Sequence, residues 1–187
     1  MGKQHQAKHK KEELSPYSWA LRIFLIAIAL SAALSLLSET TLAGADIAMA
    51  LLILGLFILL GIVFDILGVA VTAADERPFH SAAAHREKGA KEALWLLRRA
   101  SYVSSFCNDV VGDICGIVSG TTGAVIVTRL QSAFNVQNVL LSMAVTALVS
   151  GLTIGGKALG KNFAIRQSTE VVFLAGRFLH IFHRSSK

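Results

Sequence analysis

Four long apolar stretches constrain the fold of this 187-residue chain more than any other feature. They cover about residues 17–37, 47–71, 103–128 and 136–155, and each is long enough to cross a hydrocarbon core, which takes roughly 20 helical residues. None alternates polar and apolar residues over its length, and each is longer than a tilted barrel strand requires. The sequence therefore predicts an all-α integral membrane protein with four transmembrane helices.

The composition agrees with a membrane protein and narrows the classes of function. Hydrophobic residues make up 53% of the chain and charged residues 16%, which is too apolar for an ordinary soluble domain. Cys107 and Cys115 are the only two cysteines, and their spacing fits neither a disulfide framework nor a zinc site. The sequence contains no phosphate loop, zincin pattern or nucleophile elbow, so we do not expect an enzyme.

The positions of the basic residues predict the orientation, because short loops rich in Lys and Arg stay on the cytoplasmic side. Only Arg129 falls in the two loops expected outside, whereas the leader, the insert after the second span and the tail carry nearly all the others. Both termini are therefore expected in the cytoplasm, and we expect a bacterial plasma membrane. Topology and attraction to anionic lipid explain the net charge of +6, so nucleic acid is not expected as a partner.

Polar segments divide the chain into three parts. Residues 1–16 are predicted to form a basic, disordered cytoplasmic leader, residues 17–160 the transmembrane domain, and residues 161–187 a basic amphipathic cytoplasmic tail. Between the second and third spans, about residues 79–99 predict an amphipathic juxtamembrane helix on the inner membrane surface. The first apolar stretch also resembles a signal peptide; its length favours a retained span, and cleavage would leave the remaining topology unchanged.

Three carboxylates lie inside the predicted spans, where an ionisable group is costly and marks a candidate functional site. Asp65 is in the second span, and Asp109 and Asp113 are four residues apart on one face of the third. The same side carries a small-xxx-small pattern, which lets another helix approach closely: Gly112, Gly116 and Gly120. We therefore expect these carboxylates to point into a contact between helices.

The end of the fourth predicted span is rich in glycine, with Gly151, Gly155, Gly156 and Gly160. This pattern predicts a broken helix, whose exposed carbonyl groups can bind cations at membrane depth. Carboxylate, amide, hydroxyl and carbonyl oxygens together suit a hard cation such as Mg²⁺. Two other interpretations stay open: Asp109 and Asp113 hold spans together through hydrogen bonds, or they relay protons.

The order of these features resembles the transmembrane domain of the CorC/CNNM family of magnesium transporters over about residues 47–177. Four segments carry the resemblance. Thr72-Ala73-Ala74-Asp75 is similar to the end of the family's first span, and residues 87–97 are similar to its juxtamembrane helix. Residues 107–113 are similar to its Gly-Asn-x-x-x-Asn motif, and residues 152–157 to its Gly-Glu-x-x-Pro-Lys motif. Asn108 matches the ion-binding Asn of the family, and Asp113, one position beyond the exact spacing of the second Asn, is taken as its counterpart. Lys157 matches the Lys of the last motif, whereas Thr153 replaces its Glu.

The resemblance implies a divalent-cation transporter, with Mg²⁺ as the bound or transported ion, and a homodimer. The implied cation site lies between the second, third and fourth spans, with these ligands: Thr72, Asn108, Asp113 and Thr153, and Asp109 and Asp65 as outer or alternative ligands. Because Thr153 replaces a ligating Glu, two alternatives stay open. One is an accessory or structural membrane protein that keeps the fold without transport, with a protein partner still to be identified; the other is a proton- or sodium-coupled carrier.

Overall fold

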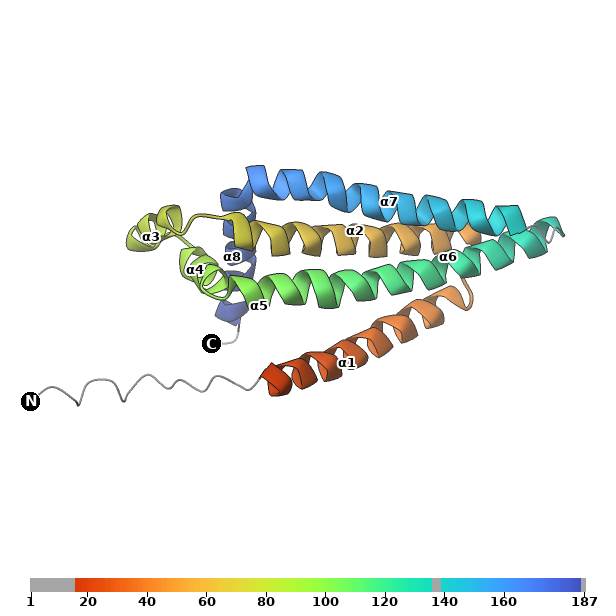
Figure 1. Cartoon of the computed structure of the whole chain (residues 1–187), viewed down its shortest axis with the longest axis horizontal. Helices are drawn as coiled ribbons and strands as arrows, with labels where there is room; N and C mark the ends of the chain where they lie inside the picture. The colour runs from red at the N-terminus through yellow and green to blue at the C-terminus, as the bar shows by residue number, and fades with distance from the viewer. Residues whose placement is uncertain (1–15, 136–138, 186–187) are drawn as a thin grey trace, which may run out of the picture.

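The computed structural model describes residues 16–135 and 139–185, in which every regular element is helical (Figure 1). The leader predicted over residues 1–16 lies, apart from Pro16, outside the described residues. The elements in chain order are α1 (Pro16–Leu42), α2 (Ile47–Ala73), α3 (Arg77–Ala84), α4 (Ala90–Leu97), α5 (Ala100–Ser105), the π-helix η1 (Phe106–Val111), α6 (Gly112–Phe134), α7 (Val139–Arg166) and α8 (Ser168–Ser185).

Four helical stretches are long and apolar enough to cross a membrane, as the sequence predicted. They are Ala20–Leu42, Ile47–Ala73, Ala100–Phe134 and Val139–Arg166. The third stretch runs through α5, η1 and α6 without interruption. The part of the chain that the structure describes is therefore all-helical, with four helices suited to a membrane.

Helix α2 lies at the centre of the bundle, with α6 and α7 packed against it. Gly156 and Gly160 of α7 lie against Ile62 and Ile66 of α2, so these two helices run in the same direction. α6 runs antiparallel to α2, and a Cβ built on Gly61 would lie 3.2 Å from the Cβ atom of Cys115. Small residues thus bring α2 close to both neighbours.

Helix α7 is continuous from Val139 to Arg166, so the predicted break at the end of the fourth span is wrong. A glycine inside a helix costs about 1 kcal/mol relative to alanine. Close packing offsets this cost, because Gly156 and Gly160 let α7 approach the side chains of α2. One consequence is that Lys157 lies within a spanning helix instead of following it.

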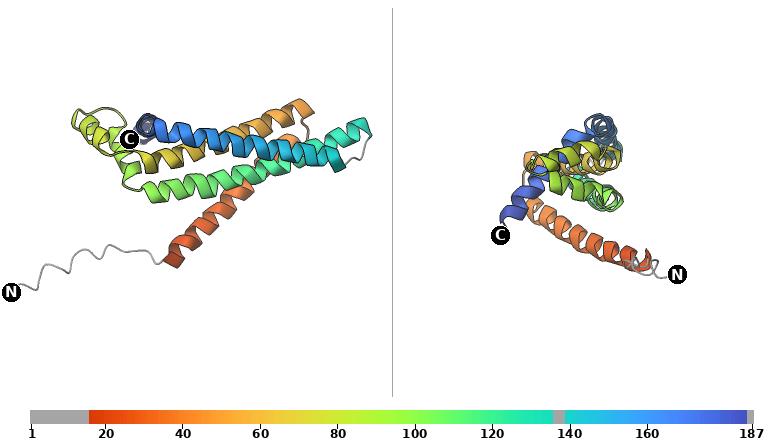
Figure 2. Two further views of the ribbon diagram at one scale, coloured as in Figure 1. Left: turned by 45° about the horizontal axis from the view of Figure 1, so that its top comes forward. Right: turned by 90° about the vertical axis from the view of Figure 1, so that its left-hand side faces the viewer.

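Helix α1 is joined to the rest of the bundle at its C-terminal end. The hydroxyl groups of Ser38 and Thr122 share a hydrogen bond of 3.3 Å, and Arg129 of α6 donates to the carbonyl oxygens of Leu42 and Ala45, where α1 turns toward α2. Toward its N-terminus the axis of α1 diverges from that of α6 (Figure 2). Arg129, the one basic residue expected in an outer loop, therefore holds the α1–α2 connection.

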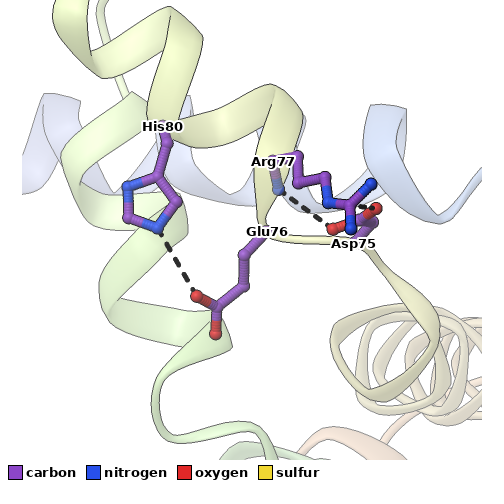
Figure 3. A network of polar contacts seen from close by, with 4 residues as sticks. All are labelled: Asp75, Glu76, Arg77 and His80. Carbon is purple, nitrogen blue, oxygen red and sulfur yellow. Dashed lines mark hydrogen bonds and ion pairs between the residues drawn. The ribbon is translucent and has the colours of Figure 1, made fainter.

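The segment predicted as one helix over about residues 79–99 forms two short helices, α3 and α4. Arg86 has φ 59° and Gly89 has φ 88°, and this left-handed backbone separates them. A polar network lies at the start of α3 (Figure 3): the Arg77 backbone N–H donates to Asp75 at 3.0 Å, and His80 lies 3.5 Å from Glu76. These side chains are exposed, so water screens the network and it adds little to stability.

Helix α8 crosses the end of the bundle that holds α3 and α4 and packs on α4 (Figure 1). Gly89 at the start of α4 lies against the backbone of Gly176 and Arg177. Next to this contact, Nδ1 of His180 lies 2.8 Å from a carboxylate oxygen of Glu92. Buried apolar side chains of α4 and α8, together with Phe79, fill the space beneath.

Candidate functional site

Asp65 is the buried carboxylate of the spanning helices. Its side chain is only 5% exposed, and within the described residues its Oδ2 atom has no hydrogen-bond partner. On α2, Gly61 faces α6 and Ile62 faces α7. Successive residues of a helix are about 100° apart around its axis, and Asp65 follows Gly61 by four residues and Ile62 by three. The Asp65 side chain therefore points between these two directions. Asp65 therefore faces the place where α2, α6 and α7 meet, which we call the three-helix interface.

Asn108 approaches the same region from the third span. It belongs to the π-helix η1, a type of turn that is often found at functional sites. Its Nδ2 donates to the hydroxyl of Ser104 at 3.3 Å, whereas its Oδ1 is buried and has no partner among the described residues. Gly68 of α2 makes room for the amide, because a Cβ at that position would overlap Oδ1. The interface thus contains a second unpaired oxygen.

Lys157 reaches the three-helix interface from α7. Its side chain is half-buried, and its Nζ lies 3.3 Å from the position of a Cβ built on Gly112. Gly61 of α2 lies opposite Cys115, and Gly68 of α2 lies opposite Asn108. Gly112 falls between Asn108 and Cys115, so it lies opposite a position of α2 within about one residue of Asp65. The ammonium and the carboxylate are therefore at the same depth, although in the described part of the chain no ion pair joins them.

Two hydroxyl groups among the predicted ligands bond to their own helices. Thr72 is exposed, and its hydroxyl donates to the carbonyl of Val69 at 2.8 Å. Thr153 is half-buried, and its hydroxyl donates to the carbonyl of Val149 at 2.8 Å. Each hydroxyl keeps a lone pair for another partner. Thr72 lies on the same face of α2 as Asp65, two turns nearer the end that carries α8.

The carboxylates of Asp109 and Asp113 do not enter the three-helix interface. Both residues are exposed on the chain, so the expectation that they point into a contact between helices is wrong within the chain. Gly116 and Gly120, on the same side of α6, have nothing within 4 Å of a built Cβ. Asp113, Gly116 and Gly120 thus form an uncovered surface, which we call the open face of α6.

On the sequence alone, Asp65 ranks below other ligands and Lys157 falls after the fourth span. A signal for Asp65 exists in the sequence, because Gly61 and Gly68 lie four residues before and three residues after it on one helix face. Glycines so arranged allow another helix to cover the residue between them. No comparable pattern marks Lys157, whose position inside the bundle depends on α7 continuing past its glycines.

The three-helix interface combines a carboxylate, an amide oxygen and an ammonium group inside the spanning helices. No group of three or more His, Cys, Asp or Glu residues that could hold a metal ion occurs in residues 16–135 and 139–185. Any cation bound here would therefore have Asp65 as its main anionic ligand, with neutral oxygens completing its shell. Comparison with known proteins gives no matching family model, no matching curated protein and no matching solved structure.

Proposed function

We propose that the protein is a transporter-like membrane protein for a divalent cation, with Mg²⁺ as the preferred ion. The observation that carries the proposal is the pair of buried, unpaired oxygens on facing helices, Asp65 Oδ2 and Asn108 Oδ1. A buried carboxylate without a partner is strongly unfavourable, and a bound cation would remove that cost. Oxygen ligands of this kind suit Mg²⁺.

The remaining predicted ligands fit a route between this site and the end of the bundle that carries α8. Thr72 lies on the Asp65 face of α2 near that end, and Thr153 lies one turn before Lys157 on α7. Their hydroxyl oxygens would serve the ion as it enters or leaves. In this proposal Asp109 and Asp113 are not ligands of the cation site.

The proposed placement in the membrane puts α3, α4, α8 and both termini on the cytoplasmic side of a bacterial plasma membrane. Trp95 is 50% exposed, and the guanidinium of Arg99 lies 4.6 Å from the centre of its ring. Exposed Leu174 and Phe178 of α8 flank Arg177. Aromatic, apolar and basic side chains in this combination suit amphipathic helices among anionic headgroups.

Magnesium should stabilise the detergent-purified full-length protein, and Asn108→Ala should weaken that effect. A ligand that binds only the folded state at about 100 times its Kd stabilises it by about 2.7 kcal/mol. Loss of one oxygen ligand should raise the apparent Kd about tenfold, or about 1.4 kcal/mol. The melting temperature is measured against MgCl₂, MnCl₂, CaCl₂ and NaCl, with Asn162→Ala, an exposed asparagine of α7, as the matched control.

The pattern of responses separates the alternatives. Stabilisation by Mg²⁺ that Asn108→Ala weakens and Asn162→Ala preserves supports the site, and Mg²⁺ flux in proteoliposomes then tests transport. A response to Na⁺ or pH without one to Mg²⁺ favours a coupled carrier. If no ion changes the melting temperature, the accessory function replaces the proposal.

We also propose that a second copy of the chain covers the open face of α6. Asp113 is exposed on a helix suited to a membrane, where a carboxylate at mid-span costs about 2.5 to 3.5 kcal/mol. Gly116 and Gly120 leave space for close approach of another helix. A homodimer through this face would remove Asp113 from lipid.

Gly116→Leu should convert this dimer to a monomer, because a leucine side chain would separate two helices that meet at a small-residue surface. The molecular mass is measured by size-exclusion chromatography with light scattering, corrected for detergent. Gly55→Leu is the matched control, since Gly55 of α2 also has nothing within 4 Å of a built Cβ. A dimer that persists in Gly116→Leu would show that the contact lies elsewhere.

A further inference from the structure

We propose that Lys157 is the tethered counter-charge of Asp65 and that a cation entering the three-helix interface must displace its ammonium group. The inference rests on the proposed function, because it concerns the same carboxylate. It adds a residue, Lys157, that sets how tightly the site binds an ion. It also explains how Asp65 is balanced when no ion is bound.

The distribution of buried charge carries the first step. Among described charged residues of the four spanning stretches, only Asp65, Arg129 and Lys157 are not exposed. Arg129 donates to the carbonyl oxygens of Leu42 and Ala45, at the connection between α1 and α2. Lys157 is therefore the cationic side chain left to balance Asp65.

The depth of the two groups carries the second step. The Lys157 ammonium lies beside Gly112, and the packing of α2 on α6 brings Gly112 within about one residue of the level of Asp65. At this depth the dielectric constant is low, so a carboxylate and an ammonium that share an interface interact strongly. Net neutrality lowers the cost of holding either charge there.

The freedom of the ammonium carries the third step. No ion pair joins Lys157 to Asp65 within the described residues, and Asp65 Oδ2 has no hydrogen-bond partner. The lysine stem is long and flexible, so its ammonium can leave the interface while α7 stays in place. A cation next to Asp65 repels the Lys157 ammonium. The cost of displacing the ammonium reduces the binding energy of the cation.

The test compares Mg²⁺ binding by the full-length protein and by Lys157→Met, followed through the melting temperature in detergent. Removing the competing ammonium should lower the apparent Kd about tenfold. Lys157→Arg keeps the charge and should bind no more tightly than the wild type. Lys161→Met is the matched control, because Lys161 lies one turn further along α7 and is exposed. An unchanged Kd in Lys157→Met would overturn the inference while the proposed function stood.

A double-mutant cycle tests the pairing without added ions. In EDTA, Asp65→Asn and Lys157→Met should each lower the melting temperature, since each leaves the other charge unbalanced. The double variant should recover most of that loss. Additive losses would overturn the inference, whatever Mg²⁺ does. Coupling in the cycle, with no Mg²⁺ response in either the wild type or Lys157→Met, would instead overturn the proposed function and the displacement that depends on it.

Discussion

Gly89→Ala should lower the melting temperature by about 5 to 15 °C and release α8 from α4. Gly89 has φ 88°, where a side chain is strained, and a Cβ there would lie 2.6 Å from the backbone nitrogen of Arg177. Strained backbone and overpacking each cost about 1 to 3 kcal/mol, and 1 kcal/mol shifts the melting temperature of a chain of this size by about 2 to 4 °C. Backbone atoms cannot move aside as a flexible side chain can.

Two measurements check this prediction. Differential scanning fluorimetry gives the melting temperature, and limited proteolysis near Gln167, between α7 and α8, reports the release of α8. Gly44→Ala is the matched control, since Gly44 lies in a connection and has nothing within 4 Å of a built Cβ. Equal melting temperatures for Gly89→Ala and the wild type would mean that α8 does not depend on this contact.

Gly68→Ala should weaken the stabilisation by Mg²⁺ about as much as Asn108→Ala does, and leave the fold intact. The added methyl group would overlap Asn108 Oδ1, and this oxygen is the end of a side chain that can rotate. The amide should therefore turn away from α2 at small cost. An oxygen ligand displaced by even 1 Å no longer meets the geometry that Mg²⁺ demands, which is near-ideal octahedral at 2.0 to 2.1 Å.

The measurement pairs the melting temperature in EDTA with the shift produced by MgCl₂. In Gly68→Ala the melting temperature in EDTA should stay close to that of the wild type, and the MgCl₂ shift should fall to about the value found for Asn108→Ala. Gly55→Ala provides the control, because Gly55 lies on the same helix with open space around it. A full Mg²⁺ shift in Gly68→Ala would remove Asn108 from the site.

The spanning helices were predictable because apolar length alone identifies them. The course of α7 was not predictable in the same way. Its glycines were interpreted as a break, yet Gly156 and Gly160 pack on Ile62 and Ile66 and the helix continues to Arg166. Whether a glycine breaks a helix or lets a neighbour approach depends on what lies opposite, which one sequence does not contain.

The candidate site was predictable in part: Asn108 was expected as a ligand, and in the structure its side chain lies against Gly68 of α2. Hydropathy could not rank Asp65 above Asp113, because a spanning helix is apolar on all sides and its buried face is set by its neighbours. The structure buries Asp65 between α6 and α7 and leaves Asp113 exposed. The π-helix around Asn108 likewise had no sequence signature.

The separation of Asp65 and Lys157 along the chain affects how the protein is made. Lys157 is about 90 residues downstream of Asp65, and ribosomes add about 5 to 20 residues per second. For about 5 to 20 s, therefore, α2 is synthesised while the helix that carries its proposed counter-charge does not exist. During that interval the Lys157 ammonium is not yet present to balance the carboxylate of α2. The order of synthesis therefore leaves α2 with an unbalanced carboxylate until α7 is made.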